Sequence, residues 1–235
     1  MKESMELHLN VAELIGAIFK THGEVYMSCY MSSWHEMIMT MSHAYCLKED
    51  KQLAYYVMSD VIEFGLSPGS NDVAVQYLAE VMPLMINVTA GSPEDNGLRQ
   101  TCGYAIGVTA ERFPEIFPQF APTALQALSF SIQAGEDPEE GESRGSCTDC
   151  CVAAVGIILT QMGDLYTRLA GQGESSQTQG VDILALQKIP FYDIWGQWLD
   201  YLPLKHDKVC TVVCISSNVV GEYADLLCCN CRRKG

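Results

Sequence analysis

The sequence is poor in basic side chains and in charged side chains generally. Lysine and arginine total 14 against 29 aspartates and glutamates, charged residues make up 18% of the chain, and the formal net charge is −15. A field of this sign repels nucleic acid and anionic membrane surfaces, and it attracts basic polypeptides. We therefore expect a basic protein partner and no nucleic acid. Acidity that serves solubility alone is the alternative.

Long uncharged apolar runs are lacking, and the first residues do not show the basic-then-apolar pattern of a secretory signal. We therefore expect no membrane span. Eleven cysteines are many for a chain without a secretory signal, but their spacing is not that of a disulfide framework. Most of them fit the small buried hydrophobic positions of helices.

Recognised catalytic motifs are also lacking. The chain contains no phosphate-binding loop, no glycine-rich dinucleotide fingerprint and no serine nucleophile elbow. None of its five histidines is linked to a cysteine by a known nucleophile motif. These absences predict a protein that is not an enzyme and that needs no cofactor.

Two Cys-x-x-Cys pairs are the one metal-like pattern. They are Cys147 with Cys150 and Cys228 with Cys231, and about 80 residues separate them, whereas paired zinc knuckles stand roughly 15–20 residues apart. We expect structural cysteines and no metal here. A zinc or redox role for the Cys-rich tail is the alternative, which metal analysis and thiol titration would test.

Apolar residues recur with a period of about 3.6 nearly everywhere, which predicts helices. The predicted apolar faces fall within residues 11–19, 27–41, 53–64, 73–88, 98–106, 116–128, 152–162, 191–202 and 209–220. Gly23 is expected to break the first helix from the second. No stretch alternates as a strand would, so the predicted fold class is all-α.

Helical hairpins bury themselves either in a closed bundle or in a stacked solenoid. Recurring aspartates favour stacking, since Asp50 and Asp95 are each expected to open the first helix of a pair. Asp149 and Asp207 continue the register after longer gaps that contain polar insertions. We therefore predict an α-α superhelix of about five HEAT-type repeats, whose period is roughly 40–47 residues.

The predicted units have the following bounds. Repeats cover residues 1–46, 47–91 and 92–134; an acidic loop covers 135–145; a further repeat covers 146–204 and includes a loop at 166–180; a partial repeat with a Cys-rich basic tail covers 205–235.

Residues 92–108 resemble the first helix of a HEAT repeat. Asp95 is placed to cap the helix, small residues follow to admit a close neighbour, and Arg99 is placed to reach the aspartate of an adjacent repeat. Residues 56–63, 81–85, 151–158 and 198–208 resemble, in the same order, segments of the importin-β (karyopherin-β) superfamily. The karyopherin beta-3 branch is the most similar. The resemblance runs from about residue 5 to residue 222 and covers only the C-terminal region of such receptors.

This resemblance implies a nuclear transport receptor segment of HEAT repeats that shuttles between cytoplasm and nucleus. It implies basic cargo proteins with nuclear localisation signals and Phe-Gly nucleoporins as partners. In the family, the Ran GTPase is held mainly by N-terminal repeats, which this chain does not match. A generic HEAT scaffold or adaptor, such as a phosphatase regulatory subunit, is the alternative function.

Cargo contacts are expected from aromatic and acidic side chains, because carboxylates pair with lysine and arginine while indole rings stack on their stems. The candidate cargo-binding residues are Trp34, Glu36, Glu80, Trp195, Trp198 and Asp200. Core packing is the alternative for the tryptophans, above all Trp198. A solvated surface is the alternative for the acidic residues.

Overall fold

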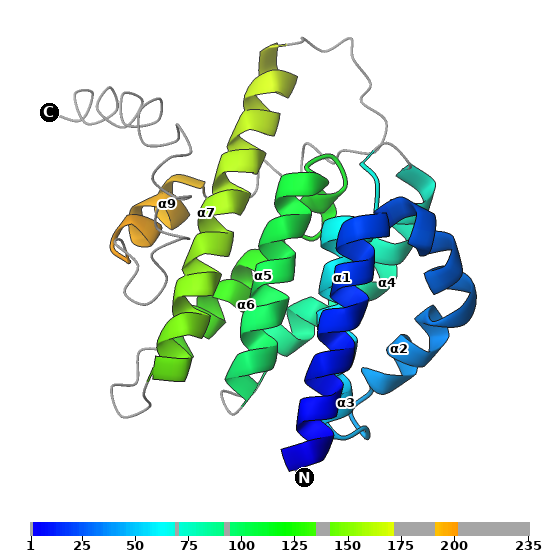
Figure 1. Cartoon of the computed structure of the whole chain (residues 1–235). Helices are drawn as coiled ribbons and strands as arrows, with labels where there is room; N and C mark the ends of the chain where they lie inside the picture. The colour runs from blue at the N-terminus through cyan, green and yellow to red at the C-terminus, as the bar shows by residue number, and fades with distance from the viewer. Residues whose placement is uncertain (1, 69–70, 92–94, 135–141, 172–190, 202–235) are drawn as a thin grey trace, which may run out of the picture.

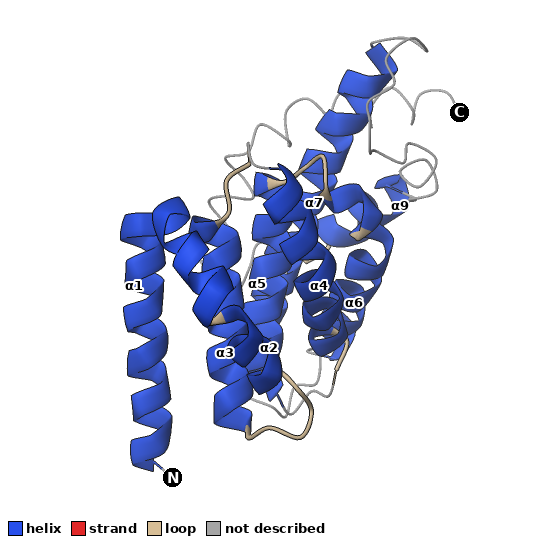
Figure 2. Ribbon diagram, turned by 90° about the vertical axis from the view of Figure 1, so that its right-hand side faces the viewer, coloured by secondary structure: helices blue, strands red, loops and turns tan. Residues whose placement is uncertain are grey.

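The computed structural model describes residues 2–68, 71–91, 95–134, 142–171 and 191–201, and these ranges are helical with no strand among them (Figure 2). The predicted all-α class is confirmed. The helix predicted around residues 209–220, the tail at 205–235 and Asp207 lie outside the described residues.

The N-terminal part contains three α-helices and one π-helical turn. They are α1 (Lys2–Ser33), α2 (His35–Met41), α3 (Lys48–Asp60) and η1 (Val61–Gly65). Gly23 interrupts α1 with a non-helical backbone conformation, as predicted. A Cβ atom at Gly23 would lie 2.5 Å from the carbonyl oxygen of Phe64. Only glycine therefore allows the kink to rest against η1.

The rest of the described chain contains five α-helices and a short 3₁₀ turn. They are α4 (Asn71–Thr89), α5 (Asn96–Arg112), η3 (Phe117–Gln119), α6 (Ala121–Ala134), α7 (Glu142–Gly171) and α9 (Phe191–Leu199).

The predicted bounds of α7 are wrong at both ends. The helix begins at Glu142, inside the predicted acidic loop, and it runs to Gly171, inside the predicted loop at 166–180. Asp149 consequently lies within the helix and does not open it. A glutamate in the first turn is favoured by the helix dipole, and Arg168 to Ala170 are good helix formers. Their local preference outweighs the polar composition that had suggested loops.

The helices pack on near neighbours in the chain. In one layer α3 lies against α1 and α5, and α5 lies against α7. In the other layer α4 lies against α6. Between the layers α2 packs on α3, α4 on α5, and α6 on α7 (Figures 1 and 2).

Small residues allow α5 to approach α7 closely, as the sequence predicted. A Cβ atom at Gly107 would lie 3.2 Å from the Cα of Ala154, and one at Gly103 would lie 3.1 Å from the Sγ of Cys151. Both contacts are tight, so a larger residue at either position would push the two helices apart.

Arg99 does not take the position that the repeat pattern predicted. Its side chain is buried, with 1% exposed, and donates to the carbonyl oxygen of Thr89 and to both the carbonyl and hydroxyl oxygens of Ser131. Asp95 makes no side-chain capping hydrogen bond to α5 and pairs with Lys48 instead. Burial of the guanidinium explains the difference, because a buried cation must satisfy its donors with the acceptors nearest to it.

One stretch of α7, Gly145–Gly163, is long and apolar enough to cross a membrane by length and composition. No membrane span was expected from the sequence. Within the protein, 67% of it is buried, and α5 and α6 pack against α7. These are also the properties of a core helix in a helical array.

Candidate functional site

Three of the predicted cargo-binding residues lie on α2 and α4 or directly before α2. Trp34 immediately precedes α2, Glu36 lies in its first turn, and Glu80 lies on α4. The contact that joins the two helices is between the Nε2 atom of His35 and a carboxylate oxygen of Glu80, 2.9 Å apart. No sequence pattern singled out His35. Only the fold shows that it contacts Glu80, which is 45 residues away in the chain.

Aromatic rings form the floor beneath this contact. The Tyr30 and Tyr77 hydroxyls lie 3.4 Å apart, and the His35 ring centroid is 5.8 Å from that of Tyr30 and 5.5 Å from that of Tyr77. Phe19 packs edge-on against Tyr30. Burial raises the pKa of Tyr30 to about 12 and raises the pKa of Tyr77 well above its ordinary value. Both phenols therefore remain neutral at physiological pH, and the floor is uncharged.

The surface above the floor combines exposed apolar and acidic side chains. We call it the α2–α4 face and define it by Met31, Trp34, Glu36, Met37 and Glu80. The fractional exposures are 38% for Met31, 36% for Trp34 and 45% for Met37. Glu36 is exposed, and the Glu80 side chain is 58% exposed. A partly open indole and exposed carboxylates are the side chains that suit a long basic residue, which has an apolar stem and a cationic end.

The other three predicted residues belong to a different part of the molecule. Trp198 is 4% exposed, and its indole nitrogen donates to the Val152 carbonyl oxygen at 2.7 Å. A Cβ atom at Gly156 would lie 2.6 Å from its ring. Trp198 is therefore part of the α7–α9 contact, and its indole is closed to a ligand in this structure.

Asp200 follows α9 and is exposed. The side chain of Trp195 lies outside the described residues. Because α9 packs on α7, at the opposite side of the molecule from α2 (Figure 1), the six predicted residues do not form one surface.

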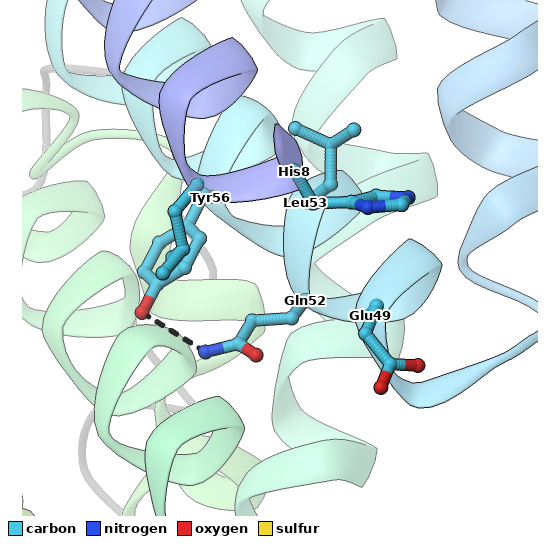
Figure 3. Close-up of a pocket in the computed structure, with 6 residues that line it drawn as sticks. His8, Glu49, Gln52, Leu53 and Tyr56 are labelled. Carbon is cyan, nitrogen blue, oxygen red and sulfur yellow. Dashed lines mark hydrogen bonds between the residues drawn. The ribbon is translucent and has the colours of Figure 1, made fainter. Parts of the chain in front are cut away.

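A small cleft that no sequence pattern indicated lies between α1 and α3 (Figure 3). Its polar lining residues are His8, Glu49, Gln52 and Tyr56, and its apolar ones are Leu9 and Leu53. The Gln52 amide donates to the Tyr56 hydroxyl at 3.2 Å. Its cavity volume is about 10 Å³, far below the roughly 300–1,000 Å³ of ordinary small-molecule sites.

His8 is held at the edge of this cleft by Asp50, whose carboxylate oxygen is 3.0 Å from its Nε2 atom. Such a pair can orient an imidazole as a base. The six lining residues, however, include no serine, threonine or cysteine for that base to activate. The cleft therefore offers polar contacts and not a nucleophile.

Among the described residues, Asp60 is the carboxylate whose pKa is most altered by its surroundings. It ends α3 and lies so close to Gly16 of α1 that a Cβ atom there would be 2.7 Å from its oxygen. Burial, and secondarily the negative charge of Glu63, raise its pKa to about 6. Glu63 in turn accepts a hydrogen bond from the Tyr104 hydroxyl at 2.9 Å.

In the ranges that the structure describes, no group of three His, Cys, Asp or Glu side chains is arranged to hold a metal ion. Cys147 and Cys150 are buried in α7. Cys228 and Cys231, which would have to join them in a zinc site, lie outside the described residues.

No protein-family model matches the chain, and no curated protein matches it significantly.

Proposed function

We propose that this chain is a non-enzymatic scaffold of HEAT-type repeats that binds basic polypeptide segments, as a segment of an importin-β-like transport receptor. The observation that carries the proposal is the α2–α4 face, where exposed apolar side chains and two exposed carboxylates lie on elements joined by the contact between His35 and Glu80.

The array of helices supports the scaffold part of the proposal. The principal contacts join elements close in the chain, α1 to α3, α3 to α5 and α5 to α7. Repeat proteins are stabilised in this neighbour-to-neighbour way, and they offer extended surfaces for partners. A HEAT superhelix is the repeat architecture that fits this packing together with the sequence pattern.

Charge supports the choice of partner. The net charge of −15 accelerates the approach of a cationic segment and opposes that of nucleic acid. On the α2–α4 face, Glu36 and Glu80 would pair with lysine or arginine, and Trp34 would cover the aliphatic stem. These are the contacts that an extended nuclear localisation signal requires.

The resemblance to transport receptors extends the proposal to nucleoporins and to movement between cytoplasm and nucleus. Phe-Gly repeats would insert their phenylalanines between neighbouring helices of the array. Contacts to Ran would belong to repeats that this chain does not match.

Fluorescence anisotropy with a labelled lysine- and arginine-rich peptide tests the binding. We expect saturable binding that weakens as salt is added. The double variant Glu36→Gln and Glu80→Gln should lower affinity about three- to tenfold, because each exposed ion pair contributes roughly 0.2–1 kcal/mol. Glutamine at position 80 retains an acceptor for His35, so the fold should be preserved.

A matched control removes the same charge elsewhere. Glu111→Gln with Glu115→Gln takes two exposed carboxylates from the end of α5 and the following turn. This pair should change affinity less than twofold. Equal loss in both double variants would mean that only the overall field attracts the peptide, and the α2–α4 face would then not be the site.

Affinity purification from cells separates transport from other scaffold roles. Recovery of nucleoporins and importin cargo supports the transport assignment. Recovery of phosphatase or assembly subunits without nucleoporins would replace it with the generic HEAT scaffold.

A further inference from the structure

The contact between α2 and α4 joins a titratable ring to one of the two carboxylates of the α2–α4 face. The Nε2 atom of His35 is 2.9 Å from a carboxylate oxygen of Glu80. An ionised carboxylate can only accept a hydrogen bond, so Nε2 must carry a proton in this contact. The Nδ1 atom has no hydrogen-bond partner in the described part of the chain. In a neutral ring its lone pair is therefore the place where a second proton binds.

Glu80 is placed to contact His35 and a ligand at the same time. The side chain of His35 is 15% exposed, whereas that of Glu80 is 58% exposed. Only one carboxylate oxygen is used in the contact with the ring, and a carboxylate has acceptor sites on both of its oxygens. A basic ligand can therefore reach Glu80 from solvent while the imidazole holds it from the protein side.

The other groups that face His35 bring no positive charge. Tyr30 of α1 and Tyr77 of α4 lie against the ring, and burial raises the pKa of both, so they are neutral. Glu36 follows His35 on α2 and is exposed. Among the described residues, the ion pairs include no lysine or arginine bound to Glu80. The charge of His35 therefore decides whether this carboxylate is neutralised from within the protein.

Histidine is the side chain whose ordinary charge change falls between about pH 5 and pH 8. With a neutral ring, the His35–Glu80 pair carries the negative charge of the carboxylate. With an imidazolium, the pair is neutral, and its charge-assisted hydrogen bond competes for the same carboxylate that a ligand cation would use. Loss of negative charge at a binding surface also weakens its electrostatic match to a basic partner.

We propose that His35 is a pH switch for the α2–α4 face: the neutral ring leaves Glu80 available to a basic peptide, and the protonated ring neutralises Glu80 and weakens peptide binding. This inference rests on the proposed function, because it concerns the regulation of the same site. Peptide would be held near neutral pH and released as the pH falls.

A second pair of the same kind provides a control within the chain. The Nε2 atom of His8 is 3.0 Å from a carboxylate oxygen of Asp50. This contact joins α1 to α3, and neither residue belongs to the α2–α4 face. Removal of either histidine takes away the same titratable group, so the comparison separates a local effect from a change in the overall charge.

Fluorescence anisotropy with the full chain and the labelled lysine- and arginine-rich peptide tests the switch, at constant ionic strength and with a dye that does not respond to pH. Between about pH 8 and pH 5.5, the affinity of the wild type should fall about two- to fivefold, which is the contribution of one exposed ion pair. His35→Gln keeps a donor for Glu80 but takes up no proton, so it should remove most of this fall. His8→Gln should retain the fall. Asp60 also titrates near pH 6, but it is unchanged in all of these proteins.

The outcomes distinguish this inference from the proposed function. Equal falls in the wild type, His35→Gln and His8→Gln would overturn the switch while leaving peptide binding in place. Absence of saturable binding at pH 8 would contradict the proposed function and the switch together. Glu80→Gln is the second variant in case His35→Gln does not fold. Its affinity should be lower at pH 8 and should lose most of its dependence on pH, and a full pH dependence in this variant would also overturn the proposal.

Discussion

Replacement of Asp60 by asparagine should stabilise the protein at neutral pH, although a carboxylate is removed. In the folded chain its pKa is about 6, against an ordinary value of 3.8, because it is buried and faces Glu63. Asparagine has nearly the same shape, so the tight contact at Gly16 is preserved. Its side chain is neutral, so no charge is buried at this position.

The size of the effect follows from the two pKa values. Their difference corresponds to about 3 kcal/mol, at about 1.4 kcal/mol for each pH unit. Solvent reaches part of the carboxylate and screens it, so we expect about 1–2 kcal/mol.

The pH dependence has a defined sign. Between about pH 4 and pH 6 the folded protein holds the proton of Asp60 more tightly than the unfolded chain does, so the wild type loses stability as pH rises through this window. The advantage of Asp60→Asn should therefore be full above about pH 7 and vanish near pH 4.

Urea unfolding of both proteins at a series of pH values measures this difference. Glu111→Gln, which neutralises an exposed carboxylate on α5, is the control and should show no such window. A destabilised asparagine variant at pH 7, or a difference that does not change with pH, would refute the argument from burial.

Three substitutions test the packing of the array by thermal or urea unfolding. Trp198→Phe removes the donor to the Val152 carbonyl and should cost about 1–3 kcal/mol; a change below about 0.5 kcal/mol would show that α9 is not anchored by this bond. Gly107→Val forces methyl groups against Ala154 and should cost at least about 1–3 kcal/mol, and an unchanged midpoint would mean that α5 and α7 are not in close contact. Tyr104→Phe removes only a surface hydrogen bond to a carboxylate, so a loss above about 1 kcal/mol would be unexpected.

Local features of the fold were predictable from the sequence. The 3.6-residue period identifies the helices because each must place apolar residues on one face. Gly23 was predictable as a break because the residues on either side of it carry separate apolar faces. The small residues of α5 were predictable as a close contact because that helix has little bulk on the side where α7 lies.

Features that depend on distant partners were not predictable. Arg99 was expected to meet an aspartate, but its acceptors are Thr89 on α4 and Ser131 on α6, and only the packing of these helices brings them to it. The contact of His35 with Glu80 joins helices 45 residues apart, and no local pattern encodes it. Trp198 is of a residue type that is common in binding sites, but it lies in the core. Only the packing of α9 on α7 shows which of the two roles applies.

The candidate residues do not all belong to one part of the molecule. Trp34, Glu36 and Glu80 lie on α2 and α4 or directly before α2, while Asp200 and the buried Trp198 belong to another side of the molecule. Residue type indicated which side chains suit a basic ligand, but the order of the helices in space decides which of them can contact the same ligand.

The most direct test of the proposed binding site is photo-crosslinking of a lysine- and arginine-rich peptide to the full chain, with the linked residues identified by mass spectrometry. We expect crosslinks concentrated in residues 31–37 and 76–84, reduced by added salt and by the double replacement of Glu36 and Glu80 with glutamine. Crosslinks confined to α9 or to the outer surface of α5, or an even distribution over all helices, would contradict the assignment of the α2–α4 face.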